Sequence, residues 1–168
     1  MSRRLAQGMP AQTAVIAFGA NLGDREATIT AAADELRAHP LIDDLRIAEP
    51  ISSVAVTTHG PDADAPAYLN TVAVIRTRLA PSVLLQELHE IERRHGRVRI
   101  ERWGDRTLDL DLISYGDVIS DGPALLLPHP RAAERDFVLR PWLALDPEAE
   151  LPGAGSVASL LAALEEER

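Results

Sequence analysis

The sequence predicts an α+β fold, a ferredoxin-like βαββαβ antiparallel sheet with helices packed on it and a C-terminal extension. Strand-like apolar stretches alternate with two segments of helical spacing between residues 13 and 115. Their order is β-α-β-β-α-β, and roughly fifty further residues carry shorter signals. We therefore expect a flexible N-terminal extension over residues 1–12 and a single domain over residues 13–168.

The first strand and helix are predicted over residues 13 to 39. TAVIAFG at residues 13–19 is a short apolar run that ends in the turn-like segment 19–24. Asp24 lies near the expected helix start, and His39-Pro40 is a stop signal. Between them the apolar residues recur at i, i+3, i+4 and i+7, as one buried helix face requires: Ile29, Ala32, Ala33 and Leu36.

The middle of the chain predicts two extended stretches, roughly 44–56 and 67–79. The Gly/Pro/Asp-rich segment 59–66 separates them, and we expect it to be a mobile surface loop. Pro81 then opens a second helix that Gly96 closes. Its apolar stripe is Leu84, Leu85, Leu88 and Ile91.

Residues 107–115 alternate as a half-buried strand does, with leucines on one side and Asp109, Asp111 and Ile113 on the other. We expect the two helices of the βαββαβ unit to pack on one face of the sheet. In the C-terminal extension we expect three additional short elements. These are an edge strand at 124–127, a helical turn at 131–134 and a last helix capped by Ser156.

Composition excludes several kinds of chemistry. All 17 basic residues are arginine, so catalysis by lysine is excluded, and the absence of cysteine excludes thiol chemistry and disulfides. Against 26 acidic residues they give a net charge of −9, which argues against nucleic-acid binding. No secretory h-region or 18-residue apolar run is present, so no membrane contact and a cytoplasmic location are expected.

Asp109 and Asp111 are the strongest candidates for metal binding. At i and i+2 of one strand their carboxylates point the same way, and Mg²⁺ prefers such oxygen ligands together with substrate phosphates. The alternative is an ordinary solvated strand face. An arginine-rich stretch directly precedes the pair and favours a small phosphorylated ligand, although ion pairs with nearby acids would also explain some of its six members: Arg93, Arg94, Arg97, Arg99, Arg102 and Arg106.

Motifs along nearly the whole chain resemble the 6-hydroxymethyl-7,8-dihydropterin pyrophosphokinase family. The most specific is RWGDRTLDLD at 102–111. The others are FGANLGD at 18–24, YLN at 68–70, GRVR at 96–99, LPHPR at 127–131, RDFVL at 135–139 and PW at 141–142. The resemblance implies transfer of a pyrophosphoryl group from ATP to 6-hydroxymethyl-7,8-dihydropterin with release of AMP, a step of folate biosynthesis. We expect the enzyme to be a monomer.

The resemblance also implies roles for individual residues. Asp109 and Asp111 would hold two Mg²⁺ ions, and the catalytic arginines Arg97 and Arg106 would meet charge on the transferred group. The implied ATP site consists of Glu92, Arg99, Trp103, Arg106, Leu112, His129 and Arg135. The implied pterin site consists of Thr57, Tyr68, Asn70, Trp103 and Phe137, of which Tyr68 and Phe137 would sandwich the ring and Asn70 would read its edge.

The chain departs from the family pattern at two places. Ala20 stands where the family usually has Ser, and residues 55–59 read AVTTH in place of a Tyr-x-Thr-x-Pro type segment. Two other functions therefore stay open, a metal-dependent nucleotide hydrolase that uses the same aspartates and a catalytically weak module that binds pterin or nucleotide.

Overall fold

A computed structural model describes residues 10–21, 23–53, 56–57, 60–61, 68–96 and 108–167. The main sheet consists of β1 (Gln12–Ala20), β2 (Ile42–Ile47), β3 (Ile51–Ser53), β6 (Tyr68–Thr77) and β7 (Asp109–Tyr115). All pairs are antiparallel, in the order β2-β6-β1-β7, with β3 on the same edge of β6 as β2. This order is that of the predicted ferredoxin-like sheet.

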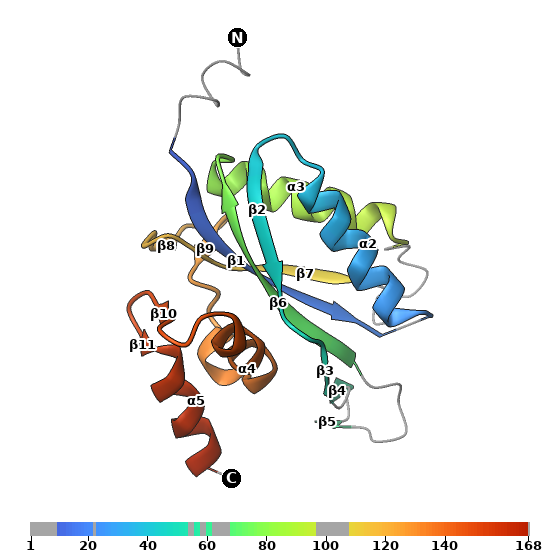
Figure 1. Cartoon of the computed structure of the whole chain (residues 1–168). Coiled ribbons are helices and arrows are strands. Elements are labelled where there is room, and N and C mark those ends of the chain that lie inside the picture. The colour runs from blue at the N-terminus through green and yellow to red at the C-terminus, as the bar shows by residue number, and fades with distance from the viewer. Residues whose placement is uncertain are drawn as a thin grey trace.

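Two helices cover one face of the sheet, α2 (Arg25–Arg37) and α3 (Pro81–Arg94) (Figure 1). Asp24 caps α2, because its side chain accepts a hydrogen bond from the backbone N–H of Ala27 at 3.1 Å. Gly96 follows α3 with a positive φ of 84°, a conformation that glycine adopts without strain. The predicted apolar stripes of both helices are confirmed, and their fully buried members are Ile29, Ala32, Ala33, Leu36, Leu84, Leu88 and Ile91.

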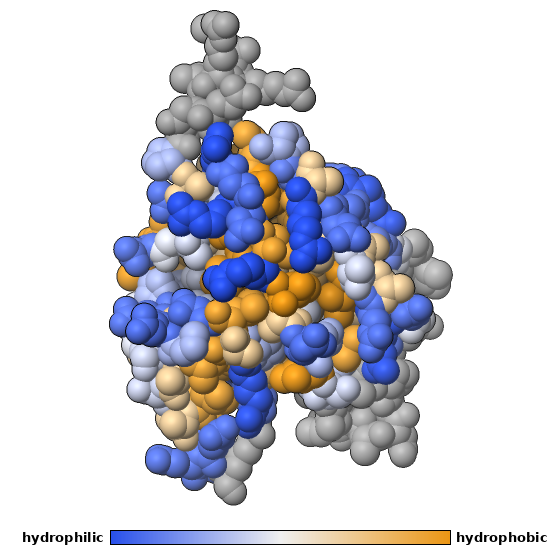
Figure 2. All heavy atoms as spheres, in the orientation of Figure 1, coloured by the Kyte–Doolittle hydropathy of each residue, from blue (hydrophilic) through white to orange (hydrophobic). Residues whose placement is uncertain are grey.

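The prediction that the two helices of the βαββαβ unit lie on one face of the sheet is confirmed, and the C-terminal extension covers the other face. It contains α4 (Asp136–Leu145), which the sequence analysis missed, and α5 (Val157–Glu166). Both helices pack in a second core against valines on the sheet face opposite α2 and α3, including Val15, Val72 and Val74. Figure 2 shows hydrophobic side chains gathered over the strands and the α4–α5 unit, with hydrophilic ones around them. The sheet is thus buried on both sides.

The remaining short elements refine the prediction. Ser156 caps α5 as expected, and η1 (Ala132–Glu134) is the expected helical turn. The predicted edge strand at 124–127 is half of a separate hairpin, β8 (Ser120–Asp121) with β9 (Leu126–Leu127). Two further hairpins pair β4 (Val56–Thr57) with β5 (Gly60–Pro61) and β10 (Glu150–Leu151) with β11 (Gly155–Ser156).

Four predicted boundaries change. The turn expected from residue 19 begins later, because Gly19 and Ala20 still pair with β6. The stretch 44–56 is divided into β2, β3 and β4, and the first break contains Pro50, which has no N–H for a sheet ladder. Within the loop expected at 59–66, Gly60–Pro61 forms β5 and the other residues lie outside the described part of the chain. Most of the expected extension 1–12 also lies outside it, and Gln12 already belongs to β1.

No helix within the described ranges has both the length and the apolar character needed to cross a bilayer.

Candidate active site

Strand β7 directs two carboxylates to the side of the sheet that faces α4. Leu110 and Leu112 point into the core beneath α2 and α3 and are 2% and 4% exposed. Asp109 and Asp111 alternate with them, are half-buried and line a cavity. The alternation therefore separates core residues from cavity residues along one strand, as the sequence pattern predicts.

Small residues of β1 form the floor between these aspartates and β6. Gly19 pairs with Asn70 on one side and with Asp109 on the other. Ala17 occupies the same position in the next row, opposite Asp111. Since neighbouring strands lie about 4.8 Å apart, the backbones that carry Asn70 and Asp109 are separated by about 10 Å. A flat molecule can therefore lie over Gly19 and Ala17 with Asn70 at one end and the aspartates at the other.

The cavity has a volume of about 450 Å³, within the range of pockets that hold drug-sized ligands. The sheet supplies one wall, and η1 with the beginning of α4 supplies the opposite wall. The lining residues on the sheet side are Ala17, Phe18, Gly19, Ser53, Tyr68, Asn70, Asp109 and Asp111. Those on the helical side are Arg131, Glu134, Arg135, Phe137 and Val138.

Tyr68, Asn70 and Phe137, three residues predicted to bind the pterin, line this one cavity. Asn70 is buried, and its amide nitrogen donates a hydrogen bond of 2.6 Å to Ser53 Oγ. The amide is therefore held in a fixed orientation. Its oxygen lies on the Gly19 side, 3.5 Å from where a β-carbon on Gly19 would be. Two aromatic rings and an oriented amide suit a flat heterocycle with N–H groups on its edge.

Arg135 joins the carboxylate end of the cavity to its aromatic end. Its guanidinium lies 3.7 Å from a carboxylate oxygen of Asp111 and 5.6 Å from the centre of the Phe137 ring. The side chain is 23% exposed, so its charge is partly shielded from water. Arg135 thus brings a permanent positive charge to the place where a phosphate next to Asp111 would lie.

Three other residues assigned to ATP by resemblance do not line the cavity. The Leu112 side chain is buried in the core beneath the helices. Glu92 is 4% exposed, and one of its carboxylate oxygens accepts a hydrogen bond from the backbone N–H of Leu110 at 3.3 Å. His129 follows β9, and its backbone N–H donates to the Ile113 carbonyl at 2.8 Å.

The half-buried position of His129 affects its charge. Burial lowers the pKa of His129 below its ordinary value, although the nearby Asp111 carboxylate acts in the opposite direction. The imidazole is therefore neutral near pH 7, and its Nδ1 accepts a hydrogen bond of 3.2 Å from the backbone N–H of Arg131.

Several predicted residues lie outside the described part of the chain. They are Arg97, Arg99, Trp103 and Arg106. Thr57 is described only as a member of β4, paired with Gly60.

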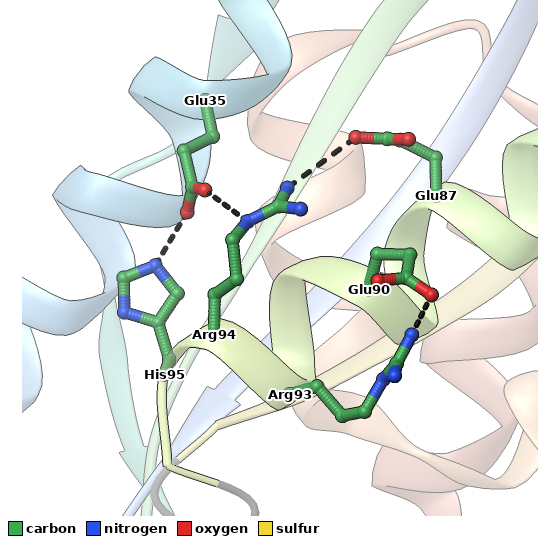
Figure 3. Close-up of polar contacts among 6 residues, drawn as sticks. All are labelled: Glu35, Glu87, Glu90, Arg93, Arg94 and His95. Carbon is green, nitrogen blue, oxygen red and sulfur yellow. Dashed lines mark hydrogen bonds and ion pairs between the residues drawn. The ribbon is translucent and has the colours of Figure 1, made fainter.

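Two members of the arginine-rich stretch form ion pairs on the helices. Arg93 pairs with Glu90, and Arg94 pairs with Glu35 and Glu87 (Figure 3). Both arginines lie in the last turn of α3. Because they form ion pairs with carboxylates, they agree with the ion-pair alternative that the sequence left open.

The sequence analysis missed five polar or small residues of the cavity: Ala17, Gly19, Ser53, Arg131 and Glu134. Ser53 reaches it because β3 pairs with β6 next to Tyr68, a register that no local pattern reveals. Arg131 and Glu134 reach it from η1, where an ion pair of 3.7 Å links them. The PHPR motif was a usable signal for Arg131, and the glycine in FGANLGD was one for the open floor at Gly19.

The comparison that decides the family covers most of the chain. Residues 15–147 match the family model described as 7,8-dihydro-6-hydroxymethylpterin-pyrophosphokinase (HPPK). The chain belongs to this family. It is 40% identical over 157 residues to the 2-amino-4-hydroxy-6-hydroxymethyldihydropteridine pyrophosphokinase of Pseudomonas aeruginosa, covering 90% of this chain and 91% of that protein. It is 38% identical over 149 residues to the Haemophilus influenzae protein of the same name, covering 89% and 91%.

Solved structures agree on the fold of the HPPK domain. A crystal structure of Plasmodium falciparum HPPK-DHPS with pteroate superposes with a TM-score of 0.63 at 10% sequence identity. The match covers 94% of this chain and 44% of that longer chain. At this identity the likeness concerns the fold, and it is consistent with the α+β architecture described above.

Proposed function

We propose that the cavity between the sheet and the beginning of α4 is the active site of this pyrophosphokinase. The activity itself is that of the HPPK family, transfer of a pyrophosphoryl group from ATP to hydroxymethyldihydropterin in folate biosynthesis. One observation carries the proposal. The pair Asp109 and Asp111 shares a cavity with Tyr68, Asn70 and Phe137, across a floor made of Gly19 and Ala17.

The two aspartates fit a magnesium site. Both are half-buried carboxylates on one strand face, and Mg²⁺ is commonly held by one or two carboxylates together with substrate phosphates and water. Within the described residues no group of three acidic or histidine side chains could hold a metal alone, so the phosphates would complete the coordination. When two Mg²⁺ ions are bound there, they neutralise charge on the triphosphate.

The pterin end of the cavity would orient the attacking group. Tyr68 and Phe137 would hold the faces of the ring, and the amide of Asn70, fixed by Ser53, would bind its N–H edge. With the edge at Asn70, the hydroxymethyl group extends over Gly19 towards Asp109. The hydroxymethyl oxygen would then lose its proton to solvent and form a bond to the β-phosphorus. The bond between the β-phosphorus and the α,β-bridging oxygen breaks at the same time, and AMP leaves with that oxygen.

The positive charges of the site would act on the triphosphate. Arg135 lies next to Asp111 and would exchange this ion pair for phosphate oxygens when the nucleotide and metal bind. Arg97 and Arg106 are the further arginines that we assign to the transferred group, and Arg99 and Trp103 to the nucleotide, all by family resemblance. Such preorganised cations stabilise charge that develops during transfer.

The proposal is tested by the nucleotide product. Incubation with ATP, Mg²⁺ and reduced hydroxymethylpterin should yield AMP and the pterin diphosphate in equal amounts. Production of ADP, or ATP consumption that does not require the pterin, would instead indicate a nucleotide hydrolase. Calorimetric binding of both ligands without any product would indicate a binding module.

Asp109→Asn and Asp111→Asn test the site itself. Each removes a carboxylate charge with little change of shape, so we expect turnover to fall by on the order of 10²-fold or more. Asp121→Asn is the matched control, because this exposed residue belongs to the β8–β9 hairpin and does not line the cavity. Wild-type turnover in both cavity variants would contradict the proposed site.

We also propose a cytoplasmic, monomeric enzyme. The absence of cysteine is compatible with a reducing compartment. Light scattering at assay concentration, combined with a linear dependence of rate on enzyme concentration, tests the monomer.

A further inference from the structure

Charged side chains link α2 to the last turn of α3, on the sheet face opposite the cavity. One carboxylate oxygen of Glu35 on α2 accepts a hydrogen bond from Arg94 Nε at 2.7 Å. The other lies 2.5 Å from His95 Nε2. Figure 3 shows Glu35 extending from its helix into the space between these two side chains. A single carboxylate thus binds two consecutive residues, Arg94 at the end of α3 and its C-cap His95.

The last turn of α3 is held from the β7 side as well. Glu92 is buried there, and its carboxylate accepts a hydrogen bond from the backbone N–H of Leu110. Leu110 stands between Asp109 and Asp111. The same helical turn is therefore fixed to α2 through Arg94 and His95 and to the metal-binding strand through Glu92.

The chain leaves α3 directly after these contacts. The backbone N–H groups of His95 and Gly96 donate to the carbonyls of Ile91 and Arg93, each at 3.2 Å, and Gly96 has a φ of 84°. Arg97 is the next residue in the sequence. The end of α3 at His95 and Gly96 is thus fixed next to the Glu35 contacts, and Arg97 itself lies outside the described part of the chain.

We propose that Glu35 is a positioning residue for pyrophosphoryl transfer, acting through His95 and Arg94 on the point at which the chain leaves α3 for Arg97. The proposal rests on the role that Proposed function gives to Arg97. Glu35 is not among the described residues that line the cavity. Its effect is on the placement of a catalytic arginine, so it should appear in turnover more than in pterin binding.

The electrostatics of Glu35 support a persistent contact. Burial by itself raises the pKa of Glu35, but hydrogen bonds and charge from His95 and Arg94 outweigh it, and the pKa lies below its ordinary value. The Glu35 side chain is 32% exposed, so its charge is only partly screened by water. Other charges near this cluster are Glu87, which contacts Arg94 at 3.4 Å, the Glu90–Arg93 pair on α3 and the Asp34–Arg37 pair on α2.

Glu35→Gln tests the proposal, with Asp34→Asn as its matched control. Asp34 is the adjacent residue, it carries the same charge, and its ion pair with Arg37 stays within α2. We expect Glu35→Gln to lower kcat by roughly twofold to thirtyfold, with KM for the pterin within twofold of wild type. Asp34→Asn should leave both values unchanged. His95→Gln and the double variant complete a cycle in which the double variant loses no more than the larger single loss.

A second readout does not depend on activity. Glu35→Gln should accelerate hydrogen exchange at the amides of His95 and Gly96 while exchange in β1 and β6 stays at the wild-type rate. Wild-type kcat and exchange in Glu35→Gln, or equal losses in Asp34→Asn, would overturn the proposal. A kcat loss that tracks a lowered fraction of folded protein would overturn it too. Failure of the proposed function is distinguishable, because the wild-type enzyme itself would then yield no AMP.

Discussion

Gly19→Ala should weaken pterin binding while leaving the fold intact. A β-carbon on Gly19 would lie 3.5 Å from Asn70 Oδ1, 3.8 Å from Tyr68 Cδ1 and 4.0 Å from Asp109 Cβ. These are ordinary van der Waals distances, and Gly19 does not have a positive φ, so the strand can accept the methyl group. In such a position Gly→Ala stabilises by about 0.4–1 kcal/mol, through the unfolded chain.

The same methyl group would occupy the floor on which the pterin is proposed to lie. Forcing extra methyl volume into a close-packed contact typically costs about 1–3 kcal/mol. Because 1.4 kcal/mol corresponds to a tenfold change, pterin affinity should fall roughly five- to one-hundred-fold. The effect on ATP alone should be smaller, because the three groups nearest the methyl include Tyr68 and Asn70 of the pterin end.

Calorimetry with the pterin and a non-hydrolysable ATP analogue measures the affinities, and thermal unfolding measures the stability. Gly122→Ala is a suitable control, because a β-carbon there would meet only Ser120 Oγ, at 3.9 Å, away from the cavity. Pterin affinity within twofold of wild type would refute the proposed floor. A large fall in the melting temperature of Gly19→Ala would refute the argument that β1 can accept a methyl group at residue 19.

Two further predictions concern stability. Burial raises the pKa of Tyr115, so the stability that its neutral hydroxyl contributes is complete below the ordinary value of about 10 and is lost as pH rises through the folded value. The unfolding free energy of Tyr115→Phe should therefore fall less steeply above pH 10 than that of the wild type. At pH 7 the substitution should cost about 1 kcal/mol, because the Tyr115 hydroxyl donates to the Leu79 carbonyl. Urea titrations in which the two proteins lose stability in parallel above pH 10 would contradict this prediction. Ser156→Ala should cost about 1 kcal/mol, since the Ser156 hydroxyl accepts from the backbone N–H of Ser159 at 3.2 Å, and an unchanged denaturation midpoint would show that this cap is not needed.

Local sequence patterns were sufficient where one element carries its own signal. The helical stripes of α2 and α3, the cap at Asp24 and the end at Gly96 follow from side-chain spacing and backbone preference. The alternation of aspartate and leucine in β7 likewise predicted which side chains share a face. These features depend on residues a few positions apart, which is the range that a pattern reports.

The alternation of buried faces along β7 ends where its pairing with β1 shifts register. Val15 pairs with Ser114 but Ile16 pairs with Leu112, so the register shifts and Ile113 is the additional residue of a bulge. Beyond it Tyr115 points into the core beneath α2 and α3. Helix α4 was missed for a comparable reason, because Pro141 lies inside it and is normally unfavourable there. Tertiary packing of Val138, Leu139 and Trp142 accounts for its formation.

The candidate site shows the same division. Family motifs predicted Tyr68, Asn70, Asp111, Arg135 and Phe137, and the cavity contains all of them. Ser53 could not be found in this way, because it reaches Asn70 only through the register of β3 on β6. The ion pairs of Glu35 depend on two helices that are distant in sequence, so they also required the structure.

Because the sheet is covered on both faces, alternate residues of its strands belong to the core on one face and to the proposed site on the other. In β1, Ala17 and Gly19 lie on the cavity side while Phe18 and Ala20 are buried beneath α2 and α3. A register shift by one residue would exchange the two sets, so the packing of the apolar set fixes the position of the cavity set. The bulge at Ile113 follows Asp109 and Asp111 in the chain, and the alternation is uninterrupted through both aspartates. The core beneath α2 and α3 therefore holds the two carboxylates in register with Gly19 and Asn70, which is the arrangement that the proposed site would use for metal-assisted transfer to a bound pterin.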